Sequence, residues 1–231
     1  MSIRTPRLYR YLDKQHADAF FSGGHLRLSS FERFRRHVDE TRMDLKEGFA
    51  QFIHRKSDGQ GETIIIDYEC FPNVYSLCAS ALPSRKLMST FSGADSAIVI
   101  WDPLGFENAV TKALRNVVRV RECIQGPCSY QFRRVIERDL GYLGITDEEN
   151  SDSSRMDRAK LETVISQVIS HDVYFLKREA YVAQAEYRFI WLIDDVAGAT
   201  IDLVVPEARH YCARWEDQGE WIAIDNVDNI E

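Results

Sequence analysis

The sequence lacks the marks of a membrane protein. No apolar run approaches the roughly 20 residues that cross a bilayer as a helix. The first residues, Met-Ser-Ile-Arg-Thr-Pro-Arg, have no apolar core of the kind found in signal peptides. Repeats and low-complexity tracts are also missing, which argues against a repeat architecture. We therefore expect a soluble, cytoplasmic protein that has no membrane partner.

Cysteine motifs are missing too. The cysteines are odd in number and scattered, and no Cys-x-x-Cys or His-x-x-x-His pair completes a zinc set. They are Cys70, Cys78, Cys123, Cys128 and Cys212. This pattern is typical of buried, reduced thiols in a cytosolic protein, and it predicts no metal site.

The common catalytic motifs are also absent. The chain has no phosphate-binding glycine loop, no His-Glu-x-x-His helix and no Gly-x-Ser-x-Gly turn. It also has no basic stripe interleaved with aromatic residues, the usual mark of single-stranded nucleic-acid binding. Any active site must therefore be assembled from residues that are dispersed along the sequence.

Composition favours a globular protein rather than a general nucleic-acid binder. The 231 residues are 45% hydrophobic, which is enough for a sizeable core, and the net charge is −7. Local arginine clusters still permit a basic groove for RNA or DNA, or they are solvated helix faces. These clusters are Arg33, Arg35 and Arg36, then Arg115, Arg119 and Arg121, then Arg133 and Arg134.

Strand patterns outnumber helix patterns and cluster together, which predicts an α+β fold. We expect strands at residues 7–12, 25–30, 49–54, 62–71, 73–80, 96–101, 117–123 and 200–205, and a terminal hairpin at 211–215 and 220–224. We expect helices at 14–22, at 106–114, around Phe132 to Leu140 and at 161–169, and a polar loop at 146–154. Residues 1–231 are interpreted as a single domain with mixed or antiparallel sheets flanked by helices.

Residues 174–194 organise the chain. Their second half alternates and then becomes wholly apolar, as expected for a strand whose far end is buried. Glu186 lies at the start of this strand, and a carboxylate anchored there is held rigidly enough for catalysis. Gln184 lies two residues back and is expected on the same face. The alternative is an ordinary ion pair between Glu186 and Arg188 on a solvated edge.

The whole chain resembles an uncharacterised bacterial domain family that is found near toxin and defence genes. The matching segments are Leu8-Tyr-Arg-Tyr, Leu26-Arg-Leu-Ser-Ser-Phe31, Leu87-Met-Ser-Thr-Phe-Ser with the strand at Ala97 after it, and Lys177…Tyr181…Ala185-Glu-Tyr-Arg188. Where the family has an aromatic residue after Leu87-Met88, this chain has Ser89. The resemblance implies an intracellular toxin or phage-defence effector, with an antitoxin or trigger protein as a partner.

A second, looser resemblance names a chemistry. The order of Arg10, then Ser89-Thr-Phe-Ser92, then Gln184-x-Glu186 is similar to the arginine, serine and glutamate arrangement of mono-ADP-ribosyltransferases. This resemblance implies an ADP-ribosyltransferase-like fold, NAD as the co-substrate and a macromolecular acceptor, either protein or nucleic acid.

The same resemblance implies roles for individual residues. Glu186 would stabilise the oxocarbenium-like transition state of NAD cleavage, and Gln184 would position the acceptor nucleophile. Arg10 would bind the pyrophosphate or ribose through its planar donors. Ser89 would orient Glu186, and Tyr181 or Phe91 would stack on nicotinamide. Ser29, at the end of the second strand, completes the expected cofactor-binding set.

Two other functions are compatible with the sequence. In one, the chain is a non-enzymatic interaction or sensor module of a defence or toxin–antitoxin system, and Arg10 and Glu186 are structural. In the other, Asp39, Asp44 and Glu47 bind a divalent metal in a nuclease, with His37 as a further candidate ligand. For the charged segment at residues 37–48 a solvated helix or loop is the main alternative.

Overall fold

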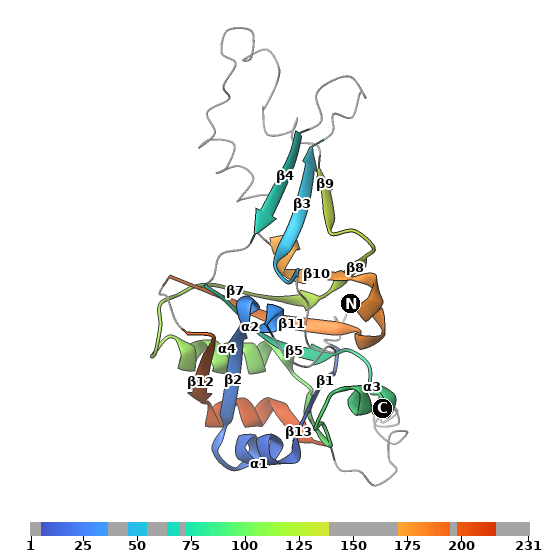
Figure 1. Cartoon of the computed structure of the whole chain (residues 1–231). Coiled ribbons are helices and arrows are strands. Elements are labelled where there is room, and N and C mark those ends of the chain that lie inside the picture. Colours follow the sequence, from blue (N-terminus) through green and yellow to red (C-terminus); the bar gives the residue numbers. More distant parts are fainter. Residues whose placement is uncertain are drawn as a thin grey trace, which may run out of the picture.

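Strands predominate in the computed structural model of the chain (Figure 1), which describes residues 6–36, 46–54, 64–69, 73–138, 171–194 and 198–215. The main sheet is antiparallel, and the smaller sheets also contain parallel pairs. In these ranges helices do not alternate regularly with parallel strands, so the fold is α+β, as predicted. Within these ranges, no helix combines the length and the apolar character needed to span a membrane.

In the described part of the chain the main sheet contains eight strands, which are antiparallel at every pairing. They are β1 (Leu8–Leu12), β2 (His25–Ser30), β5 (Val74–Ser80), β6 (Ser96–Ile100), β7 (Val120–Pro127), β11 (Glu186–Ile193), β12 (Thr200–Val204) and β13 (Cys212–Arg214). Helical segments in the described ranges include α1 (Lys14–Gly23), α2 (Phe31–Arg35), α3 (Arg85–Thr90), α4 (Pro103–Leu114), η3 (Glu179–Gln184) and η4 (Pro206–Tyr211), and residues 171–175 are also helical.

Strand β5 lies at the centre of the sheet and divides it into a fork. One edge of β5 pairs along its length with β11. The other edge is shared, because Ser76 pairs with Ser29 of β2 and Ser80 pairs with Tyr9 of β1. Among the described strands, none pairs with Leu77–Ala79 on that edge. β1 and β2 therefore diverge from β5 as two prongs, and α1 joins their far ends (Figure 1).

Local sequence explains how the fork is closed by α1. Asp13 caps the helix, because its carboxylate accepts the backbone N–H of Gln15 at 2.8 Å. Gly24 ends it in the left-handed conformation with φ of 77° and donates its N–H to the Phe20 carbonyl. The chain then enters β2 at once, so that the second prong begins directly beside the helix end.

Replacing Gly24 with alanine should destabilise the protein by at least about 2 kcal/mol. A Cβ atom at Gly24 would lie 2.5–2.6 Å from backbone atoms of Val205 and Pro206, in addition to the cost of the positive φ. Gly93→Ala is the matched control, since Gly93 has φ of 74° but the nearest atom to its Cβ would be 3.9 Å away. It should cost only about 1 kcal/mol. Urea unfolding of both variants measures the difference, and equal losses would contradict the steric argument.

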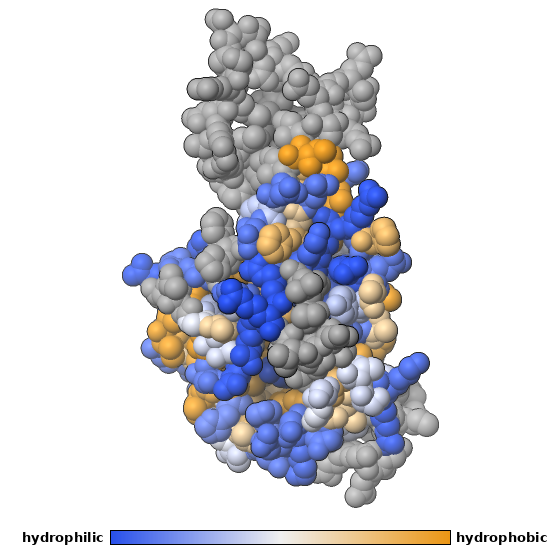
Figure 2. All heavy atoms as spheres, in the orientation of Figure 1, coloured by the Kyte–Doolittle hydropathy of each residue, from blue (hydrophilic) through white to orange (hydrophobic). Residues whose placement is uncertain are grey.

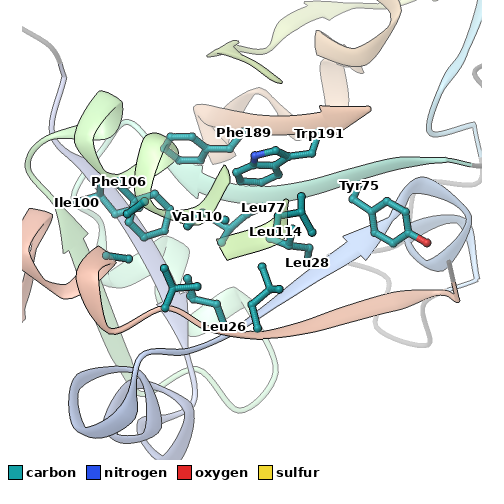
Figure 3. Close-up of a cluster of buried hydrophobic side chains, with 14 of the residues drawn as sticks. Leu26, Leu28, Tyr75, Leu77, Ile100, Phe106, Val110, Leu114, Phe189 and Trp191 are labelled. Carbon is teal, nitrogen blue, oxygen red and sulfur yellow. The ribbon is translucent and has the colours of Figure 1, made fainter. Parts of the chain in front are cut away.

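The main hydrophobic core lies between the fork and α4. Leu26 and Leu28 of β2 and Leu77 of β5 meet Phe189 and Trp191 of β11 there (Figure 3). Phe106, Val110 and Leu114, which share one face of α4, pack against them (Figure 3). The alternation that was predicted for β11 is confirmed, because Phe189, Trp191 and Ile193 enter this core whereas Ile190 and Leu192 enter a second cluster.

A smaller sheet rises beside the main one (Figure 1). It consists of β4 (Ile64–Glu69), β3 (Phe49–His54) and β9 (Val135–Arg138), and β8 (Ser129–Gln131) pairs separately with β10 (Leu176–Arg178). The predicted hairpin of β3 and β4 is confirmed.

The helix that was predicted around Phe132 to Leu140 is wrong. Residues 135–138 form β9, which pairs in parallel with β3 and buries Ile136 in the second core cluster. Phe132, which was expected on the apolar face, is 81% exposed. An apolar run this short does not distinguish a helix from a strand, and the open edge of β3 decides in favour of a strand.

The remaining expectations have mixed outcomes. The loop at 146–154, the helix at 161–169 and the second strand of the terminal hairpin lie outside the described residues. Residues 212–214 form β13, which pairs with β6. Of the cysteines, Cys78, Cys123, Cys128 and Cys212 are described and free. Burial raises the pKa of Cys78 and of Cys212 to about 12, so both are protonated thiols at neutral pH.

Candidate functional site

A cavity of about 760 Å³ occupies the fork of the main sheet. Its walls are formed by the two prongs β1 and β2, by α1, by the start of β11 and by the centre of β5. Its size is in the range of small-molecule and cofactor sites. Hydrophilic residues gather over α2 and β2 on the face shown in Figure 2.

Seven residues were predicted to form an NAD site, and five of them line this one cavity. They are Arg10 on β1, Ser29 on β2, Phe91 after α3, Gln184 at the end of η3 and Glu186 at the start of β11. They are distant in sequence, and the fork brings them together because β1, β2 and β11 all pair with β5.

The other two predicted residues lie outside the cavity lining. Ser89 is exposed on α3, and its hydroxyl donates to the carbonyl of Lys86 at 2.9 Å rather than to Glu186. The ring of Tyr181 lies 5.0 Å from the ammonium of Lys177. The roles that were expected for Ser89 in orienting Glu186 and for Tyr181 in stacking on nicotinamide therefore have no counterpart in this geometry.

Glu186 is buried and each of its carboxylate oxygens has its own cation. Oε2 accepts a short hydrogen bond from Nζ of Lys177, and Oε1 accepts one from Nε of Arg188 at 2.5 Å. Nζ of Lys177 also donates to Oε1 of Gln184 at 2.7 Å. The solvated ion pair considered for Glu186 and Arg188 is therefore wrong in one respect, because the pair is buried at the wall of a cavity.

Arg188 connects this group to the small sheet. It is 1% exposed, and its two terminal nitrogens bind both carboxylate oxygens of Glu47 at 2.8 and 3.0 Å. It also donates to the carbonyl of Tyr174 at 2.6 Å and lies 5.5 Å from the ring of Phe31. We call Glu47, Lys177, Gln184, Glu186 and Arg188 the ion-pair network; all five line the cavity.

A tight turn sets Glu186 in place. Gln184 ends η3, and Ala185 has φ of 41°, a left-handed conformation that is uncommon for a residue other than glycine. The expectation that Gln184 and Glu186 share a strand face is therefore wrong, because the turn separates them. They nevertheless converge on Lys177. The backbone N–H of Glu186 donates to the hydroxyl of Tyr130 at 2.6 Å and fixes the start of β11.

The network keeps Glu186 ionised. Burial alone would raise the pKa of this carboxyl, but the charges of Arg188 and Lys177 and their hydrogen bonds hold it below the ordinary value. Burial would likewise lower the pKa of Lys177, and the charge of Glu186 raises it instead. At neutral pH the cavity wall therefore carries a fixed carboxylate between two fixed cations.

This arrangement predicts acid sensitivity. A carboxyl with a folded-state pKa below its unfolded value stabilises the fold above the ordinary pKa of 4.5, and this stabilisation is lost as the pH falls below it. The free energy of unfolding of the native protein should therefore fall more steeply between about pH 5 and pH 3 than that of Glu186→Gln. Urea unfolding at several pH values measures both slopes, and parallel slopes would contradict the ion pairing.

Aromatic residues form another part of the wall. Tyr11 stacks on Phe91 with ring centroids 6.3 Å apart, and Tyr9, Tyr11 and Phe91 all line the cavity. The hydroxyl of Tyr11 donates to the carbonyl of Leu82 and accepts the N–H of Ser84, so it ties the segment before α3 to β1. Planar ligand groups can stack against such a wall.

The charge of the cavity differs from that of the chain. Five lining side chains are lysine or arginine, namely Arg10, Arg27, Arg33, Lys177 and Arg188, and three are acidic, namely Glu47, Glu186 and Asp202. The chain as a whole carries −7. The local excess of positive charge suits an anionic ligand such as a diphosphate. Within the first arginine cluster, Arg35 and Arg36 pair with Glu69 and Glu32, whereas Arg33 lines the cavity.

Of the candidate metal ligands between residues 37 and 47, only Glu47 is among the described residues, and its contacts do not support a metal site. Asp39 and Asp44 lie outside the described residues, and both oxygens of Glu47 are engaged by Arg188. No group of three or more His, Cys, Asp or Glu side chains suited to a metal ion occurs in the part of the chain that the structure describes.

No family model, curated protein or solved structure matches the chain. Function must therefore be argued from the cavity itself. Lys177 and Arg188 were not predicted as members of the site, although both stand in the segment that resembled the defence-associated family. Their spacing from Glu186 was visible, but the turn at Ala185 that brings Lys177 to Glu186 was not.

Proposed function

We propose that the fork cavity binds NAD and that the protein transfers ADP-ribose from NAD to a macromolecule. One observation carries the proposal: an ionised, rigidly held carboxylate, Glu186, lines a cavity of about 760 Å³ together with Arg10, Ser29, Phe91 and Gln184. An ADP-ribosyltransferase-like fold is part of the proposal.

The chemistry requires a fixed negative charge. As the bond between C1′ of the ribose and the nicotinamide nitrogen breaks, its electron pair leaves with nicotinamide, which departs neutral. The ribose develops oxocarbenium character, which a carboxylate stabilises. The acceptor nucleophile then attacks C1′ and loses its proton. Glu186 supplies the charge, and its anchoring by Lys177 and Arg188 means that little reorganisation is needed during the reaction.

Other lining residues suit other parts of the dinucleotide. The guanidinium of Arg10 suits the diphosphate, which also gains from the excess of cations in the cavity. Phe91, stacked with Tyr11, offers a wall for a planar ring. The hydroxyl of Ser29 suits a ribose hydroxyl, and Gln184 is placed beside Glu186 for the acceptor.

Incubation with NAD labelled on its adenylate portion tests the proposal. The label should move to protein or nucleic acid when the purified protein is added to a cell lysate, and nicotinamide should be released. Transfer that needs a further component of the lysate would indicate a trigger protein, as expected for a toxin or phage-defence effector. A folded protein that neither binds nor cleaves NAD in the lysate would refute the proposal.

A second function is favoured by the ion-pair network itself. Both oxygens of Glu186 are already engaged by cations, as in a structural network that supports a binding site. On that basis the protein would be a sensor module that binds an anionic nucleotide without turnover. Two results together would favour this function over ADP-ribosyl transfer. Calorimetry of the purified protein would show binding of NAD, and no nicotinamide would be released either in buffer or in lysate.

A further inference from the structure

Lys177 contacts both Gln184 and Glu186, the two residues assigned to the reaction. It is the middle residue of β10, between the buried Leu176 and the exposed Arg178. The parallel pairing of β10 with β8 holds it there, with Lys177 opposite Tyr130, whose hydroxyl binds the N–H of Glu186. Lys177 is buried and lines the cavity, and beyond its hydrogen bond to Glu186 the proposed chemistry gives it no separate role.

The ammonium group of Lys177 has three N–H donors, and among the described residues it contacts three partners. One is the carboxylate of Glu186, the second is the amide oxygen of Gln184 at 2.7 Å, and the third is the ring face of Tyr181, 5.0 Å away. Arg188 does not duplicate this function, because it binds the other oxygen of Glu186 and is otherwise engaged by Glu47 and the Tyr174 carbonyl.

We propose that Lys177 is a positioning residue of this site, which holds Glu186 as a carboxylate and orients Gln184 beside it. The inference deepens the proposed function and rests on it for its catalytic meaning. Because the oxygen of the Gln184 amide is bound to Lys177, the NH₂ group of that amide is turned away from the ammonium.

The charged and titratable groups around Glu186 make the role measurable. They are Lys177 from β10, Arg188 from β11, Cys128 and Tyr130 from the β8 segment, Cys78 from β5, and Glu47 through Arg188. The thiols and the phenol are neutral near pH 7 because burial raises their pKa values. Loss of Lys177 therefore leaves Arg188 as the one neighbouring cation in this set, while the burial of Glu186 still opposes ionisation.

Carboxyl ¹³C NMR of the full chain tests this directly. The signal of Glu186, assigned by its loss in Glu186→Gln, should show protonation at a pH at least about two units higher in Lys177→Met than in the native protein. Lys177→Arg, which keeps the charge, should stay close to the native protein. Lys112→Met, which removes an exposed pair with Glu207, is the matched control and should change nothing. An unchanged titration in Lys177→Met would overturn the inference.

A second measurement applies if Lys177→Met fails to fold. The double variant Lys177→Met/Glu186→Gln removes both charges together, and it should fold if the two side chains are direct partners. A double variant that also fails to fold would overturn the inference.

The activity readout separates this inference from the proposed function. The pH profile of kcat for NAD cleavage should shift upward in Lys177→Met, with less change in KM. Absence of NAD cleavage by the native protein and by every Lys177 variant would refute the proposed function. The NMR titration would still decide the role of Lys177.

Discussion

Arg188→Met should lower the free energy of unfolding by about 3–5 kcal/mol. The guanidinium is almost fully buried and binds two buried carboxylates, those of Glu47 and Glu186. Its removal takes away the cation that binds both oxygens of Glu47, and among the described residues it leaves Glu186 with Lys177 as its one hydrogen-bonded cation. Breaking a buried ion pair by removing one partner is expensive because the remaining charge stays away from water.

The control for this variant is an exposed pair of similar geometry. Arg27 binds both oxygens of Asp202 at 2.6 and 3.0 Å, but both side chains are more than half exposed. Arg27→Met should therefore cost less than about 1 kcal/mol. Adding Glu47→Leu to Arg188→Met should recover part of the lost stability. Urea unfolding followed by the fluorescence of buried Trp191 measures all three, and equal costs for Arg27→Met and Arg188→Met would contradict the assignment.

Glu186→Gln should reduce the rate of NAD cleavage by about 10³-fold, because the amide is isosteric but carries no charge to stabilise the oxocarbenium character. The dissociation constant for NAD should change much less, because Arg10 and the aromatic wall are untouched. Both the binding and the cleavage of NAD must be measured, because Glu186→Gln also removes the counter-ion of Lys177 and so lowers stability. Retained binding shows that the variant is still folded.

Glu107→Gln provides the matched control for that variant. Glu107 is a partly buried glutamate that accepts a hydrogen bond from the side-chain amide of Gln125, and it does not line the cavity. It should leave both binding and cleavage unchanged. Cleavage by Glu186→Gln at the native rate would show that the carboxylate has no part in the reaction.

The sequence predicts most of the strands, and the helices α1 and α4, because their signals are local. Asp13 before an amphipathic segment, Gly24 after it, and the alternation of Leu26 and Leu28 lead directly to α1 and β2. The strand at Val135 and Ile136 was missed because its signal is not local. It depends on the edge of β3, which lies far away in sequence.

The sequence predicts several residues of the candidate site, but not the contacts that those residues make. Arg10, Ser29 and Glu186 could be named because each stands at a definite place on a strand. Their convergence depends on β5 pairing with three strands, and sequence pattern does not specify such long-range pairing. The position of Lys177 depends on a left-handed alanine, Ala185, where the residue type gives no warning of a turn.

The forked sheet has a consequence for exchange of amide hydrogens with solvent. The hydrogen bonds of Ala81 to Ala185 and of Ile193 to Asn73 turn the odd-numbered residues of β5 toward β11. The amide of Cys78 therefore points into the fork, although it lies in the middle of a central strand. In deuterium oxide it should exchange much faster than the amides of Leu77 and Ala79, so that the most solvent-labile hydrogen of β5 marks the open centre of the sheet rather than a frayed end.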